Sequence, residues 1–163
     1  MADTSDTWTF ATSEARIAVV NAAEAARVAA AGKPYSFGGA TTDGFDCSGF
    51  VVYVFNRVFG TGNPPRLTAD RLSKSALFTA VPDKPRQGDL IFFSNNGDTA
   101  THVGIVASAD QWIGSQSSTG VAYVNMRNPY WKPKFLCYRG HKQFFADVRK
   151  LPLRTRRSAS AVA

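Results

Sequence analysis

The stretch DGFDCSGFVVYVF, residues 43–55, decides the fold. A cysteine, Cys47, stands between a glycine-punctuated loop and an apolar run that continues to Phe59. The apolar spacing over residues 48–59 fits a buried helix, and its β-branched content also fits a strand. We predict a helix, because Gly60 closes the run and residues 56–57 supply one polar spot. Cys47 then lies at a helix N-terminus, where unpaired N–H groups and a partial positive charge stabilise a thiolate.

The segments around this stretch predict an α+β fold. A helix is expected over residues 13–31, with an apolar stripe of Ile17, Val20 and Val28, and a short helix over 68–75. Strands are expected at 90–93, 102–108, 112–117, 120–126 and 135–140. Helices followed by short strands with tight turns indicate an antiparallel sheet. We predict one domain over residues 1–150 and a basic tail, residues 151–163, that frays.

Composition limits the functional classes. The chain has 163 residues, with 19 Lys and Arg against 12 Asp and Glu, which gives a net charge of +7. Such a chain is attracted to polyanions, including nucleic acid, anionic lipid and an acidic cell wall. No cluster of basic and aromatic residues favours nucleic acid, and no apolar run predicts membrane insertion. The N-terminus lacks the apolar core of a signal peptide, so we expect synthesis in the cytoplasm without a leader.

The two cysteines and two histidines narrow the chemistry further. Two cysteines do not make a disulfide scaffold, and neither CxxC nor HExxH is present, so no metal or cofactor is predicted. His102 begins a strand in THVGIV, where its side chain can point into a cleft. His141 lies among basic residues and is expected to be exposed. Cys47 and His102 are therefore the predicted catalytic pair.

An imidazole in such a pair needs a third group to fix its tautomer. The neighbouring strand, WIGSQS, places Gly114 and Gln116 on one face, and Gly114 has no side chain. We predict Gln116 as the orienting residue, with Ser115 and Ser117 as alternatives.

Three other interpretations stay open. A lone cysteine is more often a small core residue than a nucleophile, and Cys137 fits that description well. The same Cys–His pair could serve an acyltransferase or a transglutaminase-like enzyme. The chain could also be a binding or structural module in which Cys47 is inert.

The motifs resemble those of the NlpC/P60 cysteine peptidases. YSFGG, DGFDCSGFV, RLTADRL, RQGDLIFFS and THVGIV occur in the order and spacing of that family, over residues 33–124. The resemblance implies a compact papain-like fold, with N-terminal helices packed on a small antiparallel β-sheet. It also implies cleavage of peptide bonds in bacterial peptidoglycan, so a peptidoglycan peptide is the expected substrate.

The resemblance assigns roles to single residues. Cys47 and His102 correspond to the family's nucleophile and histidine, and Tyr35 to a tyrosine near the reacting carbonyl. Asp46 and Ser48 resemble residues that recognise the free amine of a stem peptide.

Two positions depart from the family pattern. Where many members have a third catalytic histidine, twelve residues after the first, this chain has Gly114. Arg66 begins the segment that matches an Arg-Thr-Ser-x-x-Gln run, but Leu67, Thr68 and Arg71 differ from it.

A basic chain without a leader also resembles antibacterial effectors that a type VI secretion system injects into the periplasm of a rival cell. The stretch WIGSQSSTGVAYVNMRNPYW, residues 112–131, is similar to that subgroup. This resemblance implies a cognate immunity protein that blocks the cleft. A phage or housekeeping cell-wall hydrolase is the alternative.

Overall fold

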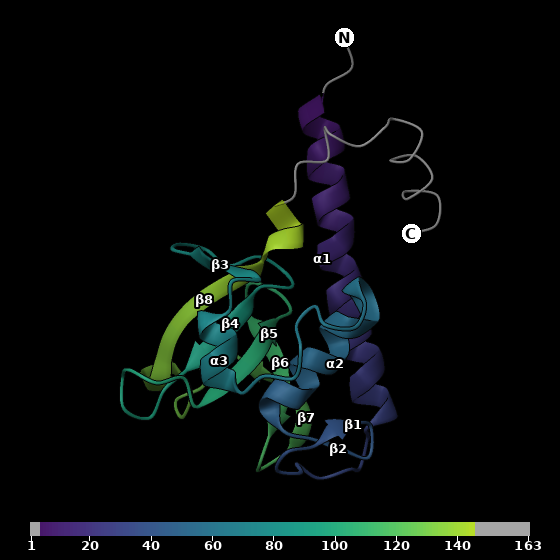
Figure 1. Cartoon of the computed structure of the whole chain (residues 1–163). Helices are drawn as coiled ribbons and strands as arrows, with labels where there is room; N and C mark the ends of the chain where they lie inside the picture. The colour runs from purple at the N-terminus through teal and green to yellow at the C-terminus, as the bar shows by residue number, and fades with distance from the viewer. Residues whose placement is uncertain (1–3, 146–163) are drawn as a thin grey trace.

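The computed structural model describes the backbone of residues 4–145 and the side chains of residues 14–145 (Figure 1). The architecture is α+β, as predicted. The helices are α1 (Thr4–Ala29), α2 (Cys47–Phe59), α3 (Ala69–Lys74) and the 3-10 turns η1 (Lys132–Lys134) and η2 (Lys142–Phe145). The predicted tail, residues 151–163, lies outside the described residues.

Six strands form one antiparallel sheet in the order β3-β8-β4-β5-β6-β7. Their bounds are β3 (Phe78–Val81), β4 (Leu90–Phe93), β5 (His102–Val106), β6 (Gln111–Gln116), β7 (Gly120–Asn125) and β8 (Phe135–His141). A small hairpin of β1 (Ala40–Thr41) and β2 (Gly44–Phe45) precedes α2. The sequence predicted five of the six sheet strands. It missed β3, whose four residues show no clear apolar alternation.

Helix α2 is the centre of the core. Asp46 caps its N-terminus, and Gly60, at φ 92°, ends it in a conformation that favours glycine. Figure 1 shows α2 lying between the long helix α1 and the sheet. Its buried face packs against α1 on one side and against β5 and β6 on the other, as its apolar sequence requires.

The helix α1 differs from its prediction in two ways. It begins at Thr4 instead of residue 13, and the apolar stripe is not its buried face. Ile17 and Val28 are 47% and 59% exposed. The buried face of the helix is formed by Arg16, Val19, Ala23 and Ala26, which are spaced three or four residues apart. Small alanines let α1 approach α2 closely, and this packing decides which face is buried, whatever the hydrophobicity of single residues.

Both faces of the sheet are covered. Side chains alternate along the strands. One set, which includes Val103, Ile105 and Ile113, joins the core formed with α1 and α2. The other set forms a second cluster of Ile91, Phe93, Val106 and Trp112. Trp131, from the loop between β7 and β8, packs against this second cluster.

His141 does not have the exposure predicted for it. Its side chain is 1% exposed and stacks on Phe59, with ring centroids 4.5 Å apart. Phe55, Phe78 and Phe144 complete the aromatic surroundings. The basic neighbours in the sequence misled the prediction, because β8 turns this one side chain inward. His141 is therefore a core residue, remote from the site described below.

None of the helices within residues 4–145 combines the length and apolarity needed to span a bilayer.

Candidate active site

The nucleophile position is fixed by the start of α2. The Asp46 carboxylate accepts a hydrogen bond of 2.6 Å from the Gly49 N–H, which makes it the N-cap of the helix. Only glycine fits at position 49, because a Cβ there would lie 2.0 Å from the Gly39 carbonyl oxygen. The loop that precedes β1 therefore presses directly onto the first turn of α2. Cys47, the first helical residue, is held rigidly at that junction.

Cys47 lines a hollow of about 460 Å³. Tyr35 and Phe37 line it from the loop before β1, and Thr101 lines it just before β5. Phe37 is 95% exposed, so the rim of this hollow carries an unburied aromatic ring. The hollow also contains Asp46 and Ser48, so the structure brings four of the six predicted site residues together.

His102 stands next to this hollow without lining it. The backbone N–H of Val103, the residue after His102, faces the Cys47 sulfur and favours its thiolate, as does the Ser48 N–H. Among the described residues, no hydrogen bond joins the thiol to the imidazole, and the ring bonds to Gln116 instead. Catalytic hydrogen bonds are often long in free enzymes and form only when substrate is bound.

The imidazole of His102 is enclosed by aromatic rings. Trp131 stacks on it with centroids 4.4 Å apart and planes 28° apart. Phe93 and Trp112 approach at 6.0 and 5.7 Å. The side chain is only 8% exposed. These rings limit the imidazole to one orientation, and the sequence analysis gave Trp131 no part in the site.

Gln116, the predicted orienting residue, contacts the His102 ring. Its Oε1 lies 3.3 Å from Nε2 of the ring, and its amide nitrogen, Nε2, donates to the Thr119 hydroxyl at 3.3 Å. The two alternatives are placed elsewhere, since Ser115 donates to the Phe45 carbonyl at 2.7 Å and Ser117 is exposed. Because the amide oxygen faces the ring, it accepts a hydrogen bond from the Nε2–H tautomer, which leaves Nδ1 free to accept a proton.

Gly114 explains how a glutamine reaches this position. A Cβ at Gly114 would lie 2.7 Å from Gln116 Oε1 and 3.0 Å from the Trp112 ring. The missing side chain therefore leaves the space into which Gln116 folds. Gly114, which stands at the family's histidine position, and Gln116 lie on the same face of β6. Because Gly114 has no side chain, the Gln116 side chain can occupy the space beside it.

Burial makes this pair neutral in the free protein. It raises the pKa of the Cys47 thiol to about 11, despite the backbone N–H groups that oppose the shift. It lowers the pKa of His102 to about 4. Burial therefore opposes the thiolate that the helix N-terminus favours, because the loss of hydration outweighs the backbone N–H groups. The proton must move from sulfur to imidazole as the sulfur attacks.

Tyr35 stands beside the nucleophile. Its hydroxyl faces the backbone N–H of Cys47, and burial raises its pKa, so it is a neutral hydrogen-bond donor at pH 7. A neutral phenol and the N–H groups at the start of α2 are donors of the kind that stabilise an oxyanion.

Asp46 and Ser48 belong to a saturated cluster around Arg66. The Arg66 guanidinium bonds both oxygens of Asp46, at 3.0 and 2.9 Å, and the Ser48 hydroxyl at 2.9 Å. Asp46 also accepts from the Gly38 N–H at 2.9 Å. An incoming amine would have to replace Arg66 on this carboxylate. The sequence had indicated Arg66 only as the start of a divergent segment, so this ion pair is a new feature of the site.

Cys137 is half-buried on β8 and burial raises its pKa, in keeping with a packing role. Within the part of the chain that the structure describes, no group of three or more His, Cys, Asp or Glu side chains is placed to hold a metal ion.

Comparison with known proteins decides the family. A model described as the NlpC/P60 family matches residues 32–140, from the loop before β1 to β8. The chain belongs to the NlpC/P60 family. This confirms the family resemblance and the predicted α+β fold.

Two relatives of this chain carry the names of peptidoglycan or murein endopeptidases. The probable peptidoglycan endopeptidase LytE of Bacillus subtilis (strain 168) is 36% identical over 115 residues, 69% of this chain and 31% of LytE. Murein DD-endopeptidase MepS/Murein LD-carboxypeptidase of Escherichia coli (strain K12) is 38% identical over 106 residues, 64% of this chain and 53% of that protein. The chain thus spans about half, or less, of the length of these relatives.

A solved structure agrees in fold. The crystal structure of the NlpC/p60 domain of the peptidoglycan hydrolase SagA matches with a TM-score of 0.59 and 26% identity, over 77% of this chain and 97% of that domain.

Proposed function

We propose that this NlpC/P60 domain is a cysteine endopeptidase that hydrolyses peptide bonds in the stem or cross-link peptides of bacterial peptidoglycan. The single observation that carries the proposal is the position of Cys47. It stands at the rigid start of a buried helix, open to a hollow, with the neighbouring imidazole bonded to Gln116. The names of LytE and MepS describe endopeptidases of this kind of substrate.

The reaction follows from the placement of these groups. The Cys47 sulfur attacks the carbonyl carbon of the substrate while its proton passes to the free ring nitrogen of His102. The Cys47 N–H and the Tyr35 hydroxyl donate to the developing oxyanion. When the C–N bond breaks, His102 returns the proton to the departing amine and an acyl-enzyme remains. Water then loses a proton to His102, attacks the thioester carbon and releases the acid, with the proton returned to the sulfur.

Gln116 and Trp131 act through His102 in this scheme. The glutamine fixes the tautomer, and the tryptophan fixes the plane of the ring and excludes water. The imidazolium that forms during attack is stabilised by the Gln116 oxygen, since that hydrogen bond favours the charged ring.

The proposal is tested by digestion of purified sacculi. The wild type should release soluble muropeptides, and mass spectrometry of the fragments identifies the bond that is cut. Cys47→Ala should release none, whereas Cys137→Ala, which removes the other thiol, should match the wild type. An added amine acceptor checks the acyltransferase alternative, because transfer products in preference to hydrolysis would contradict a peptidase.

We further propose, from the sequence alone, that the enzyme acts as an antibacterial effector in the periplasm of a target cell, with a cognate immunity protein that blocks the cleft. The basic charge and the resemblance of residues 112–131 to secreted amidase effectors support this role. Expression in Escherichia coli with an added periplasmic leader should lyse the cells, and Cys47→Ala should not. Normal growth with active, exported enzyme would refute the toxin role and favour a housekeeping or phage hydrolase.

A further inference from the structure

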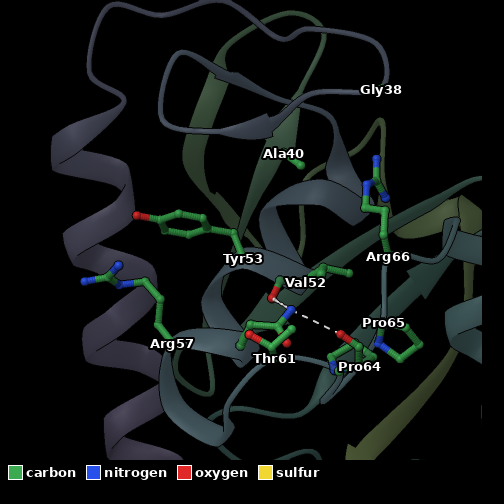
Figure 2. Close-up of a pocket in the computed structure, with 11 residues that line it drawn as sticks. Gly38, Ala40, Val52, Tyr53, Arg57, Thr61, Pro64, Pro65 and Arg66 are labelled. Carbon is green, nitrogen blue, oxygen red and sulfur yellow. Dashed lines mark hydrogen bonds between the residues drawn. The ribbon is translucent and has the colours of Figure 1, made fainter.

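A second hollow lies beside the catalytic one and has no role in the mechanism above. Its volume is about 810 Å³, within the range of small-molecule and peptide sites. Figure 2 shows the residues that line it, with Tyr53 and Val52 from α2 and Pro64 and Pro65 from the loop that follows. Most of its wall is therefore apolar.

The two hollows are adjacent. Gly38 and Arg66 line both of them, so these two residues form the boundary between the hollows. This boundary is rigid, because Asp46 holds the Gly38 N–H and the Arg66 guanidinium at the same time. A chain bound at Cys47 that extends past Arg66 would enter the second hollow.

The charges of the two hollows are opposite in kind. The catalytic hollow is lined by two acidic residues, Asp46 and Asp70, beside Arg66. The second hollow is lined by two arginines, Arg57 and Arg66, and by no acidic residue. In Figure 2 these arginines lie on opposite sides of the drawn residues.

Arg57 is the arginine that is available to a ligand. Arg66 is already bonded to Asp46, Ser48 and its neighbouring carbonyl. The Arg57 side chain is exposed, its guanidinium lies 5.4 Å from the Tyr53 ring centroid, and none of the carboxylates of residues 14–145 forms an ion pair with it. It presents its planar donors at the rim of an apolar wall, which suits a carboxylate on an aliphatic body.

We propose that the second hollow is a subsite for a carboxylate-bearing part of the same wall peptide that is cut at Cys47, with Arg57 pairing the carboxylate. The inference rests on the proposed function for the identity of the peptide. Tyr53, whose ring lies beside Arg57, contacts the aliphatic carbons next to that carboxylate, and Pro65 contacts the part of the peptide nearer Arg66. A neutral sugar ring would also suit an aromatic and proline wall, but it would not use the charge of Arg57.

The test combines one change in the enzyme with one change in the substrate. A stem tetrapeptide that contains glutamate and diaminopimelate is prepared with free carboxylates and with each carboxylate amidated in turn. In the wild type, one of the amidations should raise KM about fivefold, the effect of a single partly exposed ion pair. In Arg57→Ala the same amidation should change nothing. Arg127→Ala removes an equal charge from an exposed site outside the hollow and should behave as the wild type does.

The outcomes separate the subsite from the catalytic proposal. If amidation costs the same in Arg57→Ala as in the wild type, or costs nothing in either, the subsite is refuted while the hydrolase stands. If the wild type cuts no peptide, binding to Cys47→Ala is measured by calorimetry with the same peptides. A fivefold loss with Arg57→Ala there supports the subsite without catalysis, and equal affinities overturn it.

Discussion

A substitution at Gly114 tests the His102–Gln116 contact, because glycine leaves room there for the Gln116 side chain. In Gly114→Ala the new Cβ would lie 2.7 Å from Gln116 Oε1, a distance that side-chain carbons do not tolerate. An ordinary contact of about 3.4 Å requires the oxygen to move by roughly 0.7 Å. The hydrogen bond to His102 is already 3.3 Å long, so a shift of that size along it breaks the bond.

The expected effect falls on catalysis more than on stability. The loss of one hydrogen bond and some crowding against Trp112 cost about 1–3 kcal/mol of folding free energy. A misplaced imidazole costs more, since displacement of a catalytic group by about 1 Å can lower the rate 100-fold. We expect kcat to fall roughly 10- to 100-fold in a protein that still folds cooperatively.

A double-mutant cycle supplies the control, with kcat/KM measured on a peptide substrate. Gln116→Ala removes the same hydrogen bond directly, so Gly114→Ala in that background should add little. Trp112 is crowded equally in both backgrounds, which separates its contribution. If Gly114→Ala keeps the wild-type rate, or lowers it as much without Gln116 as with it, the positioning role of Gln116 is refuted.

Three further predictions concern burial. Trp131→Ala should expose the His102 ring and raise its pKa from about 4 toward the usual 6.5, moving the acid limb of the pH–rate profile to higher pH; an unmoved limb would show that Trp131 does not shield the base. Arg16→Met should leave the buried carboxylate of Asp89 without its ion-pair partner. The free energy of unfolding should then fall by about 3–5 kcal/mol, which lowers Tm by roughly 10 °C. A fall below about 1 kcal/mol in denaturant unfolding would contradict this. Burial also lowers the pKa of His141 to about 4 in the folded state, so the unfolded chain binds a proton at this residue at higher pH than the folded chain does. The free energy of unfolding should therefore fall by roughly 2 kcal/mol between pH 6.5 and 4. His141→Phe should show a shallower fall, and parallel curves of unfolding free energy against pH for the two proteins would exclude this cause.

The nucleophile and its helix could be predicted from sequence because their signals are local. A glycine-rich loop, a cysteine after an aspartate and an apolar run are all contained in residues 36–60. The helix end at Gly60 and the strand that begins at His102 follow from neighbours in the chain, whereas the role of Asp46 as the helix cap was not predicted. Gln116 could also be chosen from the sequence as the residue beside His102, since strand alternation places it on the same face as Gly114.

The features that sequence reasoning missed are all made by contacts between distant segments. Trp131 covers a histidine that lies 29 positions earlier, in a different strand. The buried state of His141 depends on aromatic rings from α2, β3 and η2. The neutral state of Cys47 and His102 likewise depends on how deeply the whole fold buries them, which no local pattern contains.

The central claim is that the Cys47 sulfur forms a covalent bond to the peptide it cuts. The direct measurement is electrospray mass spectrometry of the enzyme quenched in acid during turnover, followed by peptide mapping. We predict a population heavier by the mass of the acyl fragment, with the adduct on the peptide that contains Cys47, and no adduct in Cys47→Ala. An adduct on another residue, or undiminished hydrolysis by Cys47→Ala, would contradict the account.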